Sequence, residues 1–496
     1  MVRTSYFYLF CMMFLWVSHE LKGQGNNPQR PNIILFLVDD MGWTDTSVSF
    51  WKEKVDNNKF FQTPYMDSLA LRSLIFTQAY SSSPVCSPTR AAIMTGQNPM
   101  RTHITNWIPG EEQESQSKYL LPNWKQQGLT PDDITLPGVL SQSGYATVHI
   151  GKAHFGLEGT SGANPENLGF DKSYAGTHLG SPVTFFPPYV GENESRSIPD
   201  LGVYAKDSLY LTDAITALTL QVLDSLRESG DKPFFINLAH YAVHTPIEAK
   251  EEYVEKFKIK GKTDIEARYA AMVQSMDESL GAIIDKLKQL EIDQNTIIIF
   301  ASDNGGHVIK AAGSPTINEP VSGGKGFWYE GGQRIPLLIC LPQGNSHLVH
   351  YPTISEDLFP TILAMAKTEM PENHKVDGVN LLEVLENGKA KSPRPNPLVW
   401  HYPHYWAGFA IRQQEQGIGP FTAIRIGNWK YIYTYDDQQS RLYDLSVDIG
   451  EKNNLVVKHP SIAINLLDTL LEQMKNTDAP LPLDRSTQQP VPYPHL

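Results

Sequence analysis

The chain has 496 residues, 41% of them hydrophobic and 19% charged, so it is long enough for a large core and for two domains. Its net charge of −13 argues against nucleic acid as a partner, because binding a phosphate backbone requires a basic surface. The same acidity makes any local cluster of Lys, Arg and His informative, since such a cluster would form an anion site.

The N-terminus has the pattern of an export signal. Arg3 precedes an apolar run at 6–17, and polar residues follow it. This run is too short to span a membrane, so we expect residues 1–24 to be a signal peptide and the protein to be secreted or periplasmic. No second apolar stretch of spanning length occurs in the sequence, and we expect no membrane span.

Two cysteines remain after residue 24. Cys340 lies in an apolar, strand-like run and is expected in the core. Ser and Pro residues surround Cys86 and predict an exposed, unpaired thiol. Two cysteines do not make a disulfide framework. Because a free thiol is a liability in an oxidising compartment, the sequence suggests that Cys86 is chemically converted.

Two adjacent carboxylates follow the first predicted strand. The continuous apolar run 32–38 indicates a strand buried on both faces of a parallel sheet, and it ends at Asp39 and Asp40. Adjacent carboxylates at the end of a buried strand are costly unless they are paired or bind a metal. A solvated turn is the alternative for this segment alone.

A short helix is predicted over 89–95. Pro88 suits its first turn and Gly96 ends it. Cys86 therefore lies at a helix N-terminus, where backbone N–H groups and the helix dipole favour an anion. Arg90, one turn further on, is expected to reach back toward the same place.

The remaining pattern predicts an α/β fold with a large, mostly parallel sheet sandwiched by helices. Further strands are expected at 145–150, 233–239, 296–301 and 335–341, and further helices at 64–76, 135–143, 206–229 and 266–290. The segment 157–205 shows little periodicity, but its aromatic residues indicate a folded, functional surface.

The sequence pattern changes near residue 395, and this marks a predicted domain boundary. We expect residues 25–394 to form the main α/β domain and residues 395–496 a smaller α+β subdomain on a short antiparallel sheet. Its strands are predicted at 398–402, 422–426, 429–435 and 441–445, and its helix at 460–475.

Four predicted strands each end in polar residues. These are Asp39 and Asp40, Lys152 and His154, His240 and His244, and Asp303 and Asn304. Open α/β sheets bind ligands at the carboxyl ends of their strands, so this edge is the expected site. The carboxylate and amide oxygens favour a hard cation, Ca²⁺ before Mg²⁺. His240 is expected to cap or pack at its strand end.

A second, cationic set is expected to bind an anion at the same edge. Its members are Arg90, Lys152, His154, His244 and Lys325. In an acidic protein such a set would gather positive charge locally, and fixed cations together with a metal stabilise negative charge that develops in a transition state.

The segment Cys86-Ser-Pro-Thr-Arg90, continued by Ala91, Ala92, Thr95 and Gly96, resembles the signature of the type I sulfatases of the alkaline-phosphatase-like superfamily. The resemblance implies that a maturation enzyme oxidises Cys86 to Cα-formylglycine. It also implies that Ca²⁺ is bound by the modified residue and by a set of four side chains, Asp39, Asp40, Asp303 and Asn304.

The mechanism that the resemblance implies uses the hydrated formylglycine as nucleophile toward sulfur. Arg90 would hold the diol, and His244 with Lys325 nearby would support the departing alcohol. His154 would then act as the base when sulfate is expelled, and Lys152 also falls on a functional position of the family.

The layout resembles that of secreted bacterial carbohydrate sulfatases, which implies a sulfated carbohydrate substrate. Exo action on short oligosaccharides is expected because the long segment 157–205 could close a pocket. His178, in the segment 176–181, and His401 and His404, in the segment 400–406, are expected to line the sugar subsite; an aromatic packing cluster is the alternative for 400–406. Two other functions stay open: a phosphodiesterase or phosphonate hydrolase of the same superfamily, and a non-catalytic binder of sulfated glycans.

Overall fold

The structure is a computed structural model that describes residues 30–191, 196–259, 261–308, 313–412, 414 and 416–496. The expected signal peptide lies outside these residues. Within them, no helix combines the length and the apolar character that crossing a membrane requires.

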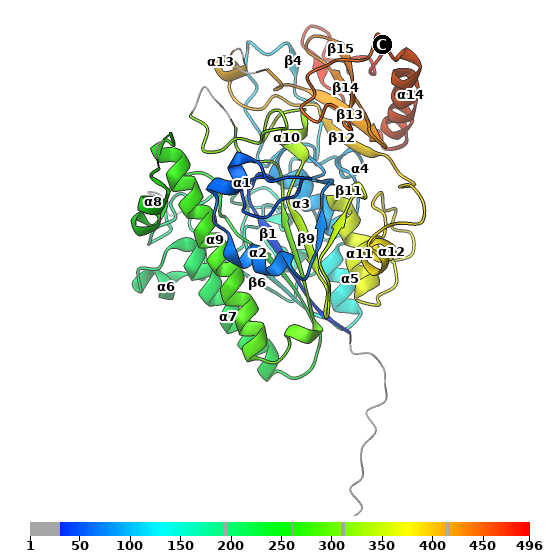
Figure 1. Cartoon of the computed structure of the whole chain (residues 1–496). Helices are drawn as coiled ribbons and strands as arrows, with labels where there is room; N and C mark the ends of the chain where they lie inside the picture. The colour runs from blue at the N-terminus through cyan, green and yellow to red at the C-terminus, as the bar shows by residue number, and fades with distance from the viewer. Residues whose placement is uncertain (1–29, 192–195, 260, 309–312, 413, 415) are drawn as a thin grey trace, which may run out of the picture.

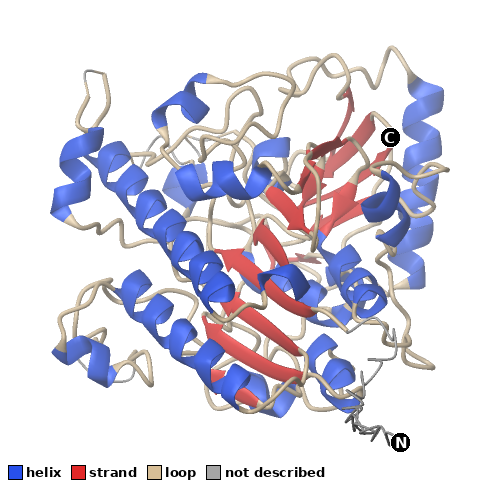
Figure 2. Ribbon diagram, turned by 60° about the horizontal axis from the view of Figure 1, so that its bottom comes forward, coloured by secondary structure: helices blue, strands red, loops and turns tan. Residues whose placement is uncertain are grey.

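An eight-stranded sheet forms the centre of the molecule (Figures 1 and 2), in the order β10-β2-β9-β8-β1-β7-β5-β6. Its strands are β1 (Asn32–Val38), β2 (Leu74–Phe76), β5 (Ala146–Gly151), β6 (Lys172–Tyr174), β7 (Phe234–Ala239), β8 (Thr296–Ser302), β9 (Leu337–Cys340) and β10 (His347–Val349). Strands β8, β1, β7, β5 and β6 are parallel, and β9 runs antiparallel to both β8 and β2. The predicted α/β class with a mostly parallel sheet is confirmed.

Helices cover both faces of this sheet (Figure 2). Side chains alternate between the faces of a strand, so Ile34 and Phe36 pack with α2 (Pro64–Ala70), α7 (Leu211–Glu228) and α9 (Asp264–Gln289). Ile33 and Leu35 point the other way, toward α3 (Cys86–Thr95), α5 (Leu136–Gln142) and α11 (Leu358–Met365). Smaller helices are α1 (Asp56–Phe60), α4 (Pro99–Thr102), α6 (Gly202–Lys206), α8 (Glu251–Phe257), α10 (Glu330–Gln333), α12 (Leu382–Asn387) and α13 (Phe409–Arg412).

Two predicted helices are wrong in extent. The helix predicted over 64–76 ends at Ala70, and Leu74–Phe76 form β2 because they pair with β9 and β10. The helix predicted over 206–229 begins only at Leu211, as α7; Lys206 is the last residue of α6, and Ser208 between the two helices has a φ of 57°, which no right-handed helix contains.

A four-stranded antiparallel sheet and one long helix lie at the top of Figure 1, as predicted for the C-terminal part. They are β12 (Leu398–Tyr402), β13 (Phe421–Ile426), β14 (Trp429–Thr434), β15 (Gln439–Asp444) and α14 (Pro460–Asn476). Buried Lys430 Nζ of β14 lies 3.1 Å from Glu330 Oε1 and 2.9 Å from Glu451 Oε1. This charge cluster joins the small sheet to α10 of the main part; the domain boundary at 395 stays a prediction.

Two short ladders complete the structure. β3 (Ala79–Tyr80) pairs with β11 (Thr353–Ile354), and β4 (Tyr119–Leu120) pairs with β16 (Leu483–Asp484). The second ladder ties the C-terminal tail back to the segment that follows α4.

Candidate active site

The site lies at the carboxyl edge of four neighbouring strands, β8, β1, β7 and β5. Asp39 and Asp40 follow β1, and Asp303 and Asn304 follow β8. Asp40 has a φ of 62°, so the chain turns sharply there, and its backbone N–H donates a hydrogen bond of 3.2 Å to Asp303 Oδ1. The parallel register of the strands therefore brings together the acidic residues that the sequence keeps 263 positions apart.

Helix α3 points its first turn at these carboxylates. It begins at Cys86, whose side chain is buried, so the predicted exposure of this thiol is wrong; polar flanking residues do not make a segment exposed when tertiary packing covers it. The Cys86 sulfur and carboxylate oxygens of Asp39 and Asp303 lie within 4.8 Å of one another. Burial raises the pKa of the thiol, although the charges of Lys152 and Lys325 oppose that shift.

Arg90 anchors the helix to the sheet edge. Its Nε lies 2.8 Å from Asp303 Oδ2, and its Nη1 donates a hydrogen bond of 2.7 Å to the Lys152 carbonyl oxygen. The helix ends at Gly96 with a φ of 68°, where a side chain would clash with Phe359. The predicted helix, its end at Gly96 and the inward position of Arg90 are therefore confirmed.

Four buried oxygen-bearing side chains fit a hard cation. Asp39, Asp40, Asp303 and Asn304 are at most 1% exposed. Among the described residues, Asp39 Oδ1 and Asn304 Oδ1 have no hydrogen-bond partner, although Arg90 Nη2 lies 3.7 Å from Asp39 Oδ1. Buried oxygens without partners are costly unless a cation binds there. Burial raises the pKa of Asp39 well above its usual value; Lys152 opposes this, and repulsion from Asp303 and Asp40 adds to it. An all-oxygen set of this kind is typical of Ca²⁺ or Mg²⁺ sites.

Two lysines and a histidine surround the carboxylates. Lys152 Nζ lies 2.6 Å from Asp39 Oδ2, and Lys325 Nζ lies 2.7 Å from Asp40 Oδ1. Lys325 Nζ is also 3.0 Å from His244 Nε2. Burial and the charge of Lys325 lower the pKa of His244 to about 3, so its neutral imidazole accepts a hydrogen bond from the ammonium group.

His154 follows β5 and has a φ of 57°. Its Nε2 donates a hydrogen bond of 2.5 Å to the Ile108 carbonyl oxygen, which fixes the tautomer and leaves a lone pair on Nδ1. Nδ1 has no partner. Burial, with the charge of Lys152, lowers the pKa of His154 well below its usual value, so the imidazole is neutral at physiological pH.

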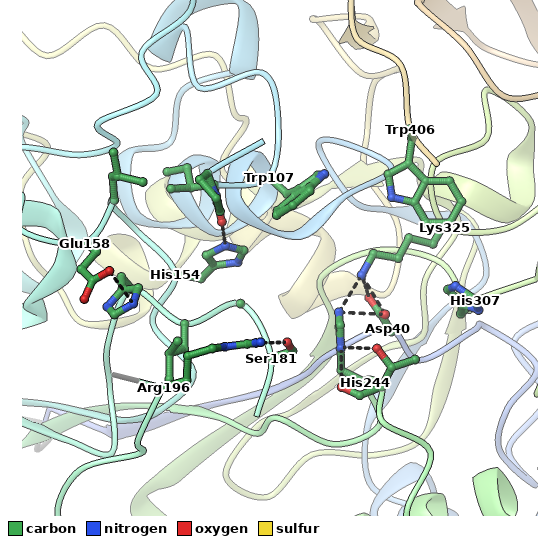
Figure 3. Close-up of a pocket in the computed structure, with 17 residues that line it drawn as sticks. Asp40, Trp107, His154, Glu158, Ser181, Arg196, His244, His307, Lys325 and Trp406 are labelled. Atoms are coloured by element: carbon green, nitrogen blue, oxygen red, sulfur yellow. Dashed lines mark hydrogen bonds and ion pairs between the residues drawn. The ribbon is translucent and has the colours of Figure 1, made fainter. Parts of the chain in front are cut away.

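Of these residues, Asp40, His154, His244 and Lys325 line a cavity of about 630 Å³ (Figure 3). We call one part the ester end, formed by Asp40, His244 and Lys325. We call the opposite part the far end, formed by Glu158, His178 and Arg196. Trp107 and Trp406 line the cavity along the upper side of the view, and His307 lies beside the ester end.

Sequence reasoning missed four residues of this cavity, Trp107, Glu158, Arg196 and His307. His307 carried a signal, since it follows Asn304 by three positions at the end of a predicted strand. Glu158 and Arg196 lie in the segment 157–205, which is expected to form a functional surface, but no motif marks them individually. Trp107 lies in a segment without a predicted element. His178 is found in the cavity, as expected for a sugar subsite.

His401 and His404 were placed wrongly in the sugar subsite. Both are at most 1% exposed and neither lines the cavity. His401 Nε2 lies 2.7 Å from the Pro480 carbonyl oxygen, and His404 Nε2 lies 2.8 Å from Thr105 Oγ1. The packing alternative holds for both because their strand and the turn after it are buried under the C-terminal tail and neighbouring aromatic rings. His240 is also a packing residue, with Nε2 3.0 Å from Ser279 Oγ.

A buried all-oxygen set beside lysine and histidine side chains fits a hydrolase of anionic esters, because a metal and fixed cations would stabilise the negative charge of such an ester. Comparison with known families gives the specific class. The profile described as "Sulfatase" matches residues 31–368, and the profile "N-sulphoglucosamine sulphohydrolase, C-terminal" matches residues 324–479. The chain belongs to the sulfatase family and is a sulfuric ester hydrolase.

Relatives match over much of their length. A "Sulfatase" of Formosa agariphila is 28% identical over 100% of this chain and 98% of its own. The human N-acetylgalactosamine-6-sulfatase is 33% identical over 74% of this chain and 68% of its own. The crystal structure of Ps i-CgsB with k-i-k-neocarrahexaose has a TM-score of 0.74 and 27% identity, covering 90% of this chain and 94% of that chain. A phosphonate monoester hydrolase of Agrobacterium radiobacter, 20% identical with a TM-score of 0.60, shares the fold alone.

Proposed function

We propose that this protein is a secreted or periplasmic sulfatase that removes sulfate from carbohydrates by means of a formylglycine at position 86 and one Ca²⁺. The observation that carries the proposal is the position of Cys86. Its sulfur, which stands where the oxygens of the modified residue would lie, is grouped with carboxylate oxygens of Asp39 and Asp303. Arg90 of the same helix is ion-paired with Asp303, so the residue at 86 faces both an oxygen-rich and a cationic surface.

The metal would be held by Asp39, Asp40, Asp303 and Asn304, and it would neutralise negative charge on the sulfate oxygens. The chain supplies the rest of the chemistry. Fixed cations that point at developing charge lower the barrier because they need no reorganisation during the reaction. Arg90 and Lys152 supply that charge beside residue 86, and a maturation enzyme that oxidises Cys86 is required as a partner.

The two proton transfers of the reaction are assigned to groups on opposite sides of the cavity. His244 and Lys325 are hydrogen-bonded to each other, and we propose that this pair donates the proton to the departing alcohol oxygen. His154 is the proposed base for the second half of the reaction, because the Ile108 carbonyl holds the proton on Nε2 and Nδ1 keeps a lone pair. Each role needs its group within hydrogen-bond reach of the reacting oxygen.

The proposed substrate is a sulfated sugar, attacked at the end of an oligosaccharide. The cavity of about 630 Å³ is larger than a sulfate group requires and within the range of small-molecule sites. Trp107 and Trp406 offer aromatic surface for a sugar ring. The names of relatives agree with this class: one acts on an N-acetylgalactosamine 6-sulfate group, and one was solved with a carrageenan-type hexaose.

The test begins with protein produced together with a formylglycine-generating enzyme. Mass spectrometry of the α3 peptide should show the loss of H₂S and the gain of one oxygen at position 86. Sulfate release is then measured on monosulfated sugars, with a phosphodiester and a phosphonate monoester in parallel. Cys86→Ala should abolish sulfate release, whereas the matched control Cys340→Ala should keep it.

Three results would overturn the proposal. An unmodified thiol with no turnover of any sulfate ester contradicts the mechanism. Equal binding of a sulfated oligosaccharide by wild type and Cys86→Ser, without turnover by either, would favour a glycan binder instead. Turnover confined to the phosphonate or phosphodiester would place the protein in the other branch of the superfamily.

A further inference from the structure

The far end of the cavity presents a cationic side chain that the proposed mechanism does not use. Arg196 lines the cavity, and among the described residues its guanidinium makes one side-chain hydrogen bond, of 3.3 Å to Ser181 Oγ, and no ion pair. A guanidinium has five N–H donors. Most of them are therefore available to a ligand.

Arg196 differs in this respect from the other cation that lines the cavity. Lys325 at the ester end is ion-paired with Asp40 at 2.7 Å, so its charge is largely balanced within the protein. The acidic group of the far end, Glu158, lies with Oε2 3.9 Å from His178 Nε2, and among the described residues it forms no ion pair with Arg196. Within the part of the chain that the structure describes, the guanidinium of Arg196 is therefore a cation of the far end without an ion pair.

The direction of the side chain favours contact with a ligand. In Figure 3 Arg196 extends along the lower side of the cavity toward Ser181, between the far end and the ester end. The planar fork of arginine matches the paired oxygens of a sulfate or carboxylate and binds them bidentately. A sugar whose sulfate ester occupies the ester end would present its other substituents to this fork.

We propose that Arg196 is a specificity-determining residue that binds a second anionic group, a sulfate or a carboxylate, on the substrate. This inference rests on the proposed function, since it assumes that a sulfated sugar occupies the cavity. The preferred substrate is then a sugar or disaccharide with at least two negative groups, one removed at the ester end and one held at the far end.

The experiment compares three substrates of the matured enzyme. They are a monosulfated monosaccharide, the same sugar with a second sulfate, and a monosulfated disaccharide with a uronate carboxylate. Loss of charge-assisted hydrogen bonds in Arg196→Gln should raise KM roughly 10- to 100-fold for the substrates that carry the second anion, and less than about threefold for the monosulfated sugar. The two dianionic substrates show whether the second group is a sulfate or a carboxylate.

Arg196→Lys keeps the charge and loses the fork, so it should recover part of the lost affinity. Arg227→Gln is the matched control, because Arg227 is an exposed arginine whose ion pair with Asp231 lies at the end of α7, outside the cavity. It should change none of the three KM values. Thermal melting of each variant verifies that the fold is kept.

An equal rise in KM for all three substrates in Arg196→Gln overturns the inference, as does Arg196→Lys with no recovery. Wild type that hydrolyses monosulfated and dianionic sugars with equal KM also overturns it, while the proposed function stands. Wild type that hydrolyses none of the sulfate esters contradicts the proposed function itself, so the two failures are distinguishable.

Discussion

Arg90 Nε lies 2.8 Å from Asp303 Oδ2, and both side chains are at most 1% exposed. This ion pair joins the first turn of α3 to the end of β8, and so fixes residue 86 relative to the acidic set. Buried ion pairs are balanced internally: removing one partner leaves the other charge buried without compensation.

Arg90→Gln is therefore expected to destabilise the metal-depleted protein by about 3–5 kcal/mol. Urea unfolding of EDTA-treated protein measures this loss. The exposed pair Arg227–Asp231 provides the control, because Arg227→Gln should change the free energy of unfolding by less than about 1 kcal/mol. Equal stability of the two variants would contradict a structural role for the Arg90–Asp303 pair.

Calcium should stabilise the protein through the acidic set. At a free Ca²⁺ concentration of about a hundred times Kd, the gain in free energy of unfolding is about 2.7 kcal/mol. Asp39→Asn removes one negative charge from the set and should strongly reduce the rise in Tm on calcium addition. Asp231→Asn, at an exposed position, should leave that rise unchanged. An equal rise in Tm on calcium addition for Asp39→Asn and wild type would show that calcium binds at another site.

Substitutions of Trp107 and His404 are expected to have different effects, because Trp107 lines the cavity and His404 is a packing residue. Trp107 lines the cavity, so Trp107→Ala should raise KM for a sugar substrate about three- to tenfold through lost aromatic contact. His404 is buried against Thr105 outside the cavity, so His404→Ala should lower Tm and leave KM of the folded enzyme unchanged. Steady-state kinetics beside thermal melting decide this, and a higher KM in His404→Ala would restore its place in the sugar subsite.

Glu111 makes stability depend on pH near neutrality. Its carboxylate accepts a hydrogen bond of 2.7 Å from the Ala407 backbone N–H, beside the cavity residue Trp406. Burial raises the pKa of Glu111 to about 7, against the lowering effects of this hydrogen bond and of Arg412, and Glu114 adds to the rise. The folded state therefore binds more protons than the unfolded chain between about pH 4.5 and pH 7, and this contribution to stability is lost as the pH rises through that window.

Glu111→Gln removes the ionisation and keeps an acceptor for Ala407. Relative to wild type it should gain on the order of 1–2 kcal/mol in free energy of unfolding between pH 4.5 and pH 8. Urea unfolding across that pH range measures the difference. Glu112→Gln, at an exposed neighbour, is the control and should show a flat difference. A flat difference for Glu111→Gln as well would show that Glu111 titrates as it does in water.

Local sequence patterns predicted the central elements well. The continuous apolar run 32–38 is strand β1, and the run at 398–402 is strand β12, each with the predicted bounds. Both are decided by a short run of strand-forming residues that ends abruptly on each side. The segment 74–76 falls within the helix predicted over 64–76, yet it forms β2 because β9 and β10 offer partners from more than 250 residues away.

By itself the sequence determined that acidic and basic residues meet at one edge of the sheet. Strand direction alone suffices for this, because the residues that follow parallel strands share one edge. Only the tertiary structure decided which side chains face the cavity. Arg196 and Trp107 lie in it, and His401 and His404 do not, because burial depends on contacts between segments that no local pattern connects.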